Sequence, residues 1–165
     1  MIDDSQIEYE INFIRSILLN TKSIAIVGLS DKENRPSHFA AKYLQKKGFR
    51  IIPINPITND KKILGEKVYK SLKELDFIPD MVDLFVKKNK IESIVKEAIK
   101  LKTKTIWLQL GLFDKKSEKM AKISGINFVM NRCPKIEYAK LSGELGWAGI
   151  NSEIISNKRI LFQNG

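Results

Sequence analysis

One segment combines residue types that suit the binding of a phosphate group. Residues 28–37 read GLSDKENRPS, with Gly28 first, the hydroxyls of Ser30 and Ser37, and Arg35 between them. A glycine lets the backbone approach a ligand, an arginine donates charge-assisted hydrogen bonds to phosphate oxygens, and a following helix directs its first N–H groups at an anion. Ordinary connections between a strand and a helix use the same residue types, so the segment alone leaves both interpretations open.

Two common nucleotide-binding motifs are absent. A G-x-G-x-x-G fingerprint would need more glycines, but the next glycine after Gly28 is Gly48, and G-x-x-x-x-G-K-[ST] does not occur. An NAD-binding fold also uses an acidic residue at the end of its second strand to hold the ribose hydroxyls. Here that position carries Asn55 and Pro56, and the next acid is Asp60. The sequence therefore disfavours a dinucleotide-dependent enzyme.

The chain has too few histidines and cysteines for several catalytic centres. With one histidine, His38, and one cysteine, Cys133, a Cys/His zinc site cannot form, and a Ser-His-Asp triad would depend on His38 alone. His38 falls in the first turn of a predicted helix, which favours a structural role. Cys133 is either a reactive thiol beside Arg132 or a small, partly buried residue. No catalytic residues are identified, which favours binding over catalysis without deciding it.

Apolar runs alternate with helical patterns along the chain. The runs predict strands over 23–28, 50–54, 81–86, 105–110 and 126–130, and helical spacing predicts helices over 5–19, 37–47, 89–101 and 114–124. Strands linked by such helices pair in parallel, so we expect an α/β fold: a single Rossmann-like domain with a doubly wound sheet of about five strands. Pro53 lies inside the second strand, which places that strand at a sheet edge or the proline at its end.

The residues at and just after the ends of the predicted strands are candidates for a binding site, because ligands of open parallel sheets bind at the carboxyl ends of the strands. They are Asn55 and Pro56, Val86 and Lys87, Gln109 and Gly111, and Asn131 and Cys133. This edge offers amides and cations but lacks the paired acids of general acid–base catalysis, so it suits holding an anion. Within the strands, the core is favoured over a stacking platform for Trp107, and a structural hydrogen bond is favoured over a place close to the ligand for Asp83.

The composition is that of a basic globular protein. The chain has 165 residues, 43% hydrophobic content and a formal net charge of +10 at pH 7, enough for one domain with a sizeable core. Its 24 lysines outnumber its 5 arginines and are spread along the chain. This distribution favours a solvated surface over a nucleic-acid site, although it should attract an anionic ligand.

Nothing in the sequence indicates export or a membrane. No apolar run approaches the ~20 residues of a membrane-spanning helix, and the opening MIDDSQIEYE lacks a basic and then apolar signal region. A single cysteine rules out an intramolecular disulfide. We expect a cytoplasmic protein.

A series of motifs resembles the CoA-binding domain family of small bacterial proteins, which is similar to the CoA-binding domain of the succinyl-CoA synthetase alpha subunit. The series runs from IAIVGLSDKENRPSHFAAKYLQKKGFRIIPINP through LGEKVYKSLKEL, PDMVDLFV and TIWLQLG to GINFVMNRCPKIEY. It covers residues 20–140 in the expected order, and the combination of the motifs is more specific than any one of them.

The resemblance implies a Rossmann-like fold that binds coenzyme A along the carboxyl edge of the sheet. Carried over residue by residue, the site would comprise Gly28, Leu29, Ser30, Arg35, Ser37, Asn55, Pro56, Val86, Lys87, Gln109, Gly111, Asn131 and Cys133. One position departs from the family, which commonly has V-F-R where this chain has Phe85-Val86-Lys87. Lysine pairs with phosphate as a point charge and lacks the bidentate fork of arginine.

These observations predict a CoA-binding domain over residues 21–140, an N-terminal helix within 1–20 packed on it, and a C-terminal extension over 141–165. The expected function is non-catalytic binding of coenzyme A or an acyl-CoA. Two alternatives stay open: an NAD(P)-dependent oxidoreductase on the same fold, and a CoA-binding subunit of a multi-component enzyme. The expected partner is small-molecule CoA or acyl-CoA, without nucleic acid or membrane, and a homo-oligomer is an option.

Overall fold

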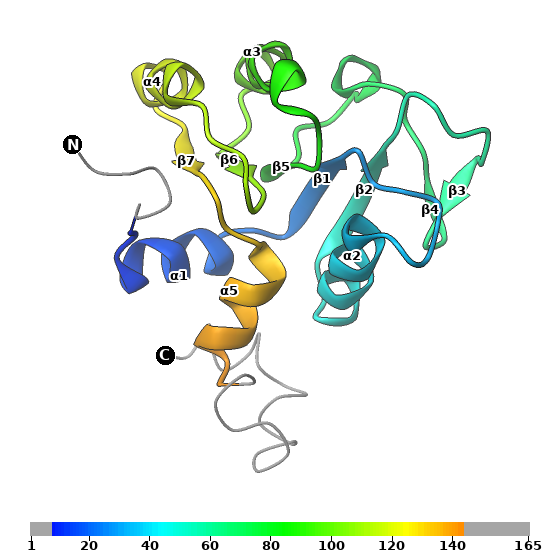
Figure 1. Ribbon diagram of the computed structural model, residues 1–165, viewed down its shortest axis with the longest axis horizontal. Helices are drawn as coiled ribbons and strands as arrows, with labels where there is room; N and C mark the ends of the chain where they lie inside the picture. Colours follow the sequence, from blue (N-terminus) through cyan, green and yellow to red (C-terminus); the bar gives the residue numbers. More distant parts are fainter. Residues whose placement is uncertain (1–7, 144–165) are drawn as a thin grey trace.

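A sheet of five parallel strands forms the centre of the computed structural model, which describes residues 8–143 (Figure 1). The strands are β1 (Ser23–Val27), β2 (Arg50–Ile54), β5 (Met81–Leu84), β6 (Thr105–Leu108) and β7 (Asn127–Val129). Their spatial order is β2-β1-β5-β6-β7. The order therefore reverses between β1 and β5, which is where ligands bind in doubly wound folds. The predicted α/β fold, a doubly wound sheet of five strands in one domain, is confirmed.

Helices cover both faces of the sheet (Figure 1). One face carries α1 (Ile11–Leu19), α2 (Pro36–Lys46) and α5 (Pro134–Leu141), and the other carries α3 (Ile91–Leu101) and α4 (Lys115–Ile123). Shorter elements are the hairpin of β3 (Lys62–Ile63) and β4 (Glu66–Lys67) and the 3-10 helices η2 (Leu72–Glu74) and η3 (Lys88–Lys90). This layering leaves the carboxyl ends of the strands at one edge, outside both helical layers.

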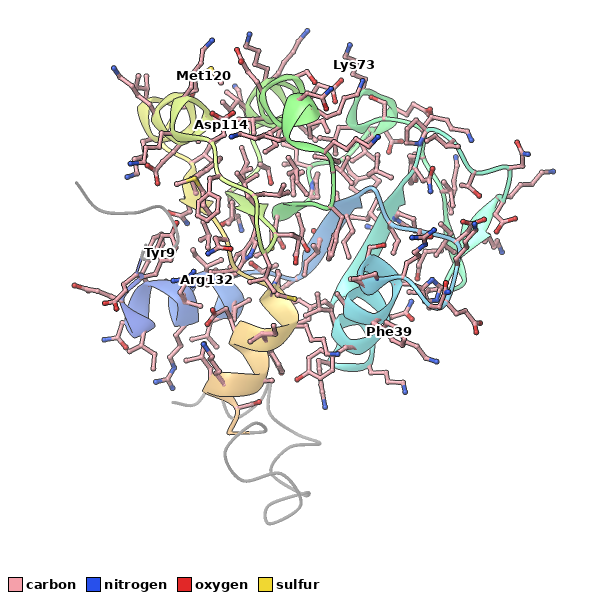
Figure 2. All side chains as sticks on the ribbon, viewed as in Figure 1. Tyr9, Phe39, Lys73, Asp114, Met120 and Arg132 are labelled. Carbon is pink, nitrogen blue, oxygen red and sulfur yellow. The ribbon has the colours of Figure 1, made fainter. Side chains whose placement is uncertain are left out.

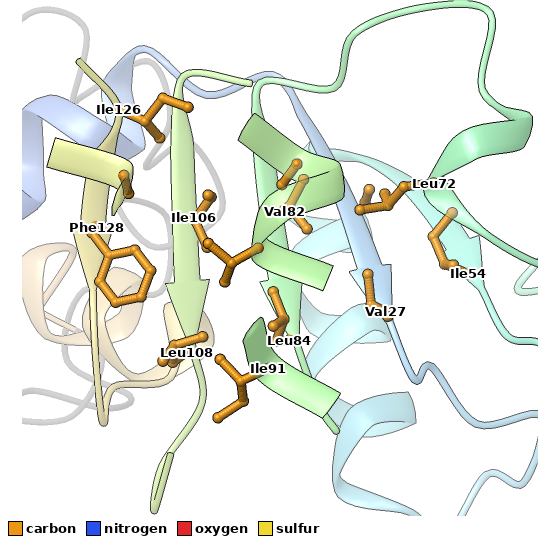
Figure 3. Close-up of a cluster of buried hydrophobic side chains, with 14 of the residues drawn as sticks. Val27, Ile54, Leu72, Val82, Leu84, Ile91, Ile106, Leu108, Ile126 and Phe128 are labelled. Carbon is orange, nitrogen blue, oxygen red and sulfur yellow. The ribbon is translucent and has the colours of Figure 1, made fainter. Parts of the chain in front are cut away.

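Alternating side chains of the strands fill a separate core on each face. In the core shown in Figure 3, Val27, Val82 and Ile106 of three neighbouring strands belong to one buried cluster with Ile91 at the start of α3. Each such side chain contributes roughly 1.5–3 kcal/mol by leaving water. On the opposite face, Trp107 is fully buried, as predicted from its place in a strand.

The prediction for Pro53 is confirmed, because β2 lies at the edge of the sheet. The Pro53 carbonyl accepts a hydrogen bond from the Tyr69 N–H (2.9 Å) on the outer side of β2, away from β1. The N–H and C=O of one strand residue point to the same side, so the N–H that proline lacks would also have faced outward. The proline therefore removes no hydrogen bond between β1 and β2.

Several boundaries differ from those predicted. The strands expected at 81–86 and 105–110 end at residues 84 and 108, and the helix expected at 5–19 begins at residue 11. The hairpin of β3 and β4 was not predicted, because two-residue strands carry no readable periodicity. Helix α5 was also missed, although Pro134 at its first position is a common helix start. Residues 5–7 of the predicted helix and 144–165 of the predicted extension lie outside the described residues.

Candidate functional site

Gly28 occupies the point where the strand order reverses. Its N–H donates to the Ile54 carbonyl (2.8 Å), and the Phe85 N–H donates to the Val27 carbonyl (2.8 Å), so both neighbouring strands continue their pairing with β1 at this level. Gly28 has φ of +89°, and a Cβ there would lie 2.1 Å from the Phe85 carbonyl oxygen. Glycine is needed because the chain after β5 approaches so closely.

The first turn of α2 holds the loop that follows Gly28. The Ser30 N–H donates to Ser37 Oγ (3.0 Å), and Ser30 Oγ accepts from the Lys32 N–H (3.1 Å). His38 Nδ1 lies 2.9 Å from the Ser30 carbonyl oxygen, so it bonds there when that nitrogen carries the hydrogen. His38 thus has a structural contact, as its position in the helix predicts, and the Ser37 hydroxyl shapes the loop from a buried position.

Asn55 ties the loop after β2 to the loop after β1. Its Nδ2 donates to the Leu29 carbonyl (2.9 Å), and its Oδ1 accepts from the N–H groups of Ile57 (2.8 Å) and Thr58 (3.0 Å). Thr58 Oγ1 adds a second tie by donating to Asp31 Oδ2 (3.1 Å). The predicted residue Asn55 therefore organises the site, and the tie between Thr58 and Asp31 was missed because no local pattern relates residues so far apart in sequence.

A buried carboxyl lies beneath this edge. Asp83 of β5 is fully buried, and its Oδ1 accepts a hydrogen bond from Gln109 Nε2 (2.6 Å), directly after β6. Its Oδ2 is buried and has no hydrogen-bond partner among residues 8–143. Removal from water raises the pKa of Asp83 to about 8, although the Gln109 bond acts in the opposite direction. Asp83 therefore has the structural hydrogen bond that was predicted, and its raised pKa favours the neutral acid at pH 7.

The loops after β6 and β7 are also joined. The Gly111 N–H donates to Asn131 Oδ1 (2.8 Å), and Asn131 has φ of +56°, in the left-handed region that asparagine tolerates better than most residues. Trp107 Nε1 donates to the Arg132 carbonyl (2.8 Å). Asn131, like Asn55, holds one loop of the edge against another.

The Arg132 guanidinium is engaged in contacts within the protein. Figure 2 shows it beside Tyr9, and its guanidinium lies 5.5 Å from the centre of the Tyr9 ring. Its Nε is 3.5 Å from Glu137 Oε1, and Nη1 donates to the Asn131 carbonyl (2.7 Å). The Tyr9 hydroxyl in turn accepts from the Met130 N–H (2.8 Å). These contacts anchor the turn between β7 and α5.

Burial makes the Cys133 thiol a weak nucleophile. Cys133 precedes α5, and desolvation raises the pKa of its thiol above the ordinary value of 9.0. Electrostatic repulsion from Asp83 acts in the same direction, whereas backbone hydrogen bonds with Ile136 and Lys135 oppose it. Of the two interpretations offered by the sequence, the structure favours the buried small residue.

The cations that remain exposed at this edge include Arg35 and Lys87. Arg35 precedes α2 and provides no side-chain cap to that helix, and Lys87 precedes η3. They belong to the loops after β1 and β5, the two strands between which the order reverses. Apolar side chains are exposed at the same edge: Ile57 after β2 is 87% exposed, and Leu110 after β6 is 57% exposed. The edge thus presents positive charge and apolar surface together.

The predicted site residues all follow the strands or begin α2, but they are not equally accessible. Side chains or backbone are exposed or half-buried at Gly28, Ser30, Arg35, Asn55, Pro56, Val86, Lys87, Gly111 and Asn131, whereas Leu29, Ser37, Gln109 and Cys133 are buried. Within residues 8–143, no group of three His, Cys, Asp or Glu side chains could hold a metal ion. Among the same residues, no helix is long and apolar enough to cross a membrane.

Comparison with known proteins identifies similar chains. Residues 22–139 match a sequence family described as a CoA binding domain. The uncharacterized protein YneT of Bacillus subtilis is 36% identical over 126 residues, which are 76% of this chain and 92% of YneT.

Two solved structures share the fold at similar identity. A hypothetical protein from Pyrococcus horikoshii has a TM-score of 0.77 and 34% identity, and the match covers 86% of this chain and 99% of that one. A protein from Thermus thermophilus described as cell-free ID.343 has a TM-score of 0.76 and 30% identity, with 81% and 99% covered. The chain spans nearly the whole length of each of these proteins.

Proposed function

Because this chain belongs to the CoA binding domain family, we propose that it binds coenzyme A or an acyl-CoA at the carboxyl edge of its sheet without catalysing a reaction. The observation that carries the proposal is the placement of Arg35 and Lys87. Both are exposed, and they flank the reversal point between β1 and β5. Cations in that position suit a ligand whose charge resides on several phosphates.

The phosphates would meet the loop after β1. Ser30 and Arg35 belong to a loop whose shape is held by Ser37, His38 and Asn55, so its polar groups are preorganised. A preorganised loop loses less conformational entropy when a ligand binds. Arg35 would donate to phosphate oxygens with its planar fork, and Lys87 would act as a point charge from the loop after β5.

The remaining parts of the ligand would lie on either side of the phosphates. Pro56 and the exposed Ile57 after β2 offer apolar surface to an adenine ring. On the other side, Gly111 and Asn131 join the loops after β6 and β7, where a pantetheine arm could bond to backbone and amide groups. Ligand sites commonly combine apolar walls with a few polar groups in this way.

Three side chains that could serve in catalysis are buried, which supports binding without catalysis. The carboxyl nearest the edge in β5, Asp83, is buried with one hydrogen bond, and the thiol of Cys133 is buried with a raised pKa. His38 has its Nδ1 at the Ser30 carbonyl. General acid–base or nucleophilic catalysis needs such groups within reach of the substrate. We therefore assign these side chains to the support of the site.

Thermal unfolding with a panel of ligands tests the proposal. The purified chain would be melted with CoA, acetyl-CoA, NAD, NADP and ATP, each at millimolar concentration. A ligand at ~100 times its Kd adds about 2.7 kcal/mol, which is several degrees in Tm for a chain of this size. We expect shifts with CoA and acetyl-CoA and none with NAD or NADP. A shift with NAD or NADP alone would instead support an oxidoreductase.

A further inference from the structure

Asp83 is a buried titratable group among the side chains that support the site, and the proposed function makes no use of its protonation state. Its relative exposure is 0%, and it lies in β5 one strand position before the last residue, directly beneath the edge. Its Oδ1 accepts from Gln109 Nε2 at 2.6 Å, and its Oδ2 is buried with no hydrogen-bond partner in the part of the chain that the structure describes. A carboxylate needs more than one donor to be stable away from water. Burial with a single donor therefore favours the neutral acid over the carboxylate.

Within residues 8–143, no cation acts on the pKa of Asp83. Its partners in register on the neighbouring strands, Ile26 and Trp107, are both fully buried and uncharged. From the helical layer on this face, α1 and α2 contribute apolar side chains to the core. The elements packed on this face also contribute titratable side chains: Tyr138 of α5 is fully buried, His38 of α2 is buried with its Nδ1 2.9 Å from the Ser30 carbonyl oxygen, and Cys133 precedes α5. Burial and, to a lesser extent, repulsion from Asp83 raise the pKa of the Cys133 thiol.

Gln109 links this carboxyl to the surface of the edge. It is the first residue after β6 and itself buried, and its main-chain carbonyl accepts from the Leu112 N–H (2.9 Å), which closes the turn that exposes Leu110 and Gly111. With Nε2 bound to Asp83, the Gln109 amide has a fixed orientation beneath that turn. Loss of the acceptor would leave a buried N–H group without a partner, which costs more than the bond itself contributes.

We propose that Asp83 is a positioning residue that must be protonated for ligand binding: as a neutral acid it fixes Gln109 beneath the site, and its ionisation weakens the binding of an anionic ligand. A carboxylate at this position would place a negative charge in a low-dielectric interior beneath the phosphate-binding edge, where repulsion is poorly screened. The inference rests on the proposed binding of CoA or acyl-CoA, and it adds a dependence on pH that family membership does not predict.

The pH dependence of acetyl-CoA affinity tests this inference. Acetyl-CoA has no free thiol, and the second ionisation of a phosphate lies near 6, so the ligand itself does not titrate between pH 7 and 9. With the pKa of Asp83 at about 8, the neutral fraction falls about tenfold between pH 7 and 9. We expect the Kd of the wild-type chain, measured by isothermal titration calorimetry, to rise by up to about tenfold over this range.

Three variants separate the role of the proton from that of the fold. Asp83→Asn keeps an acceptor for Gln109 and cannot ionise, so its Kd should stay close to the wild-type value at pH 7 and should not change up to pH 9. Asp83→Leu removes the acceptor, so its Kd should be several-fold higher at every pH. Asp80→Asn, just before β5, is the matched control. Burial acts to raise the pKa of Asp80, but hydrogen bonds from the Lys22 and Ser23 N–H groups and the charge of Lys104 outweigh it and lower that pKa, so the replacement should leave the wild-type slope in place.

The outcomes distinguish this inference from the proposed function. Binding at pH 7 with an unchanged Kd at pH 9 would overturn the role of the Asp83 proton and leave CoA binding intact. The same rise of Kd in Asp83→Asn as in the wild type would also overturn it. Absence of acetyl-CoA binding by the wild type at any pH, together with no effect of CoA on Tm, would overturn the proposed function and this inference with it.

Discussion

Among single residues, Gly28 must be glycine because of its own backbone conformation and its packing, whether or not a ligand binds. The sequence suggests that this glycine lets the backbone approach a phosphate, but in the structure the group that approaches it is the Phe85 carbonyl, 2.1 Å from where a Cβ would lie. The Gly28 N–H also donates to the Ile54 carbonyl, so Gly28 contacts the chain at the ends of both strands that neighbour β1. The residue at the centre of the candidate site is therefore required by the fold.

Gly28→Ala should destabilise the chain severely. The methyl group would meet backbone atoms that cannot rotate away, and alanine would be strained at φ of +89°. We expect a loss of roughly 3 kcal/mol or more in the free energy of unfolding, measured by urea denaturation. Gly125→Ala is the matched control: it has φ of +74° with nothing within 4 Å, so it should lose about 1–2 kcal/mol. Equal losses in the two variants would show that the approach of Phe85 does not matter.

Among the secondary-structure elements, β5 is buried along its whole length and yet contains an ionisable side chain, that of Asp83. The pKa of Asp83 rises from an ordinary 3.8 to about 8 on folding, chiefly through desolvation. Between these values the folded chain holds a proton that the unfolded chain has released. The free energy of unfolding therefore falls as pH rises from about 4 to about 8, by up to about 1.4 kcal/mol per pH unit from this residue.

Asp83→Asn should remove this part of the pH dependence. Urea denaturation of the wild type and the variant at pH 5, 6.5 and 8 would show the wild type losing stability relative to the variant as pH rises, by up to about 4 kcal/mol over the range. This measurement needs no ligand and is independent of any binding. Parallel profiles for the two chains would contradict a buried neutral acid at position 83.

Some of the elements could be predicted from the sequence and others could not. The five strands, the edge position of β2 and the core position of Trp107 were predictable because each depends on local periodicity or on the missing N–H of Pro53. The hairpin of β3 and β4 was not, because two-residue strands carry no readable periodicity, and helix α5 was missed although Pro134 marks its start. In the same way, the sequence places Asp83 and Gln109 in separate strands, and their hydrogen bond follows from the strand order.

At the scale of the whole molecule, the net charge of +10 acts as a general attraction for anions, and the fold decides where an anion is held. Many lysines are exposed far from the carboxyl edge, such as Lys46 at the last turn of α2 and Lys100 at the last turn of α3. Others pair with carboxylates on the helical layers, such as Lys116 with Glu92 (2.9 Å). Charge alone therefore does not define the site, whereas the reversal of strand order does.

The most direct test of a CoA site at the carboxyl edge is to measure the affinity of CoA for three chains by isothermal titration calorimetry. The chains are the wild type, Arg35→Ala and Lys46→Ala. Both variants lose one exposed cation from α2 or its boundary, at opposite ends of the helix. Loss of a charge-assisted hydrogen bond costs about 1.5–3 kcal/mol. We predict that Arg35→Ala weakens binding by about tenfold or more and that Lys46→Ala changes it by less than about twofold. An unchanged affinity in Arg35→Ala, or an equal loss in both variants, would contradict a site at the carboxyl edge.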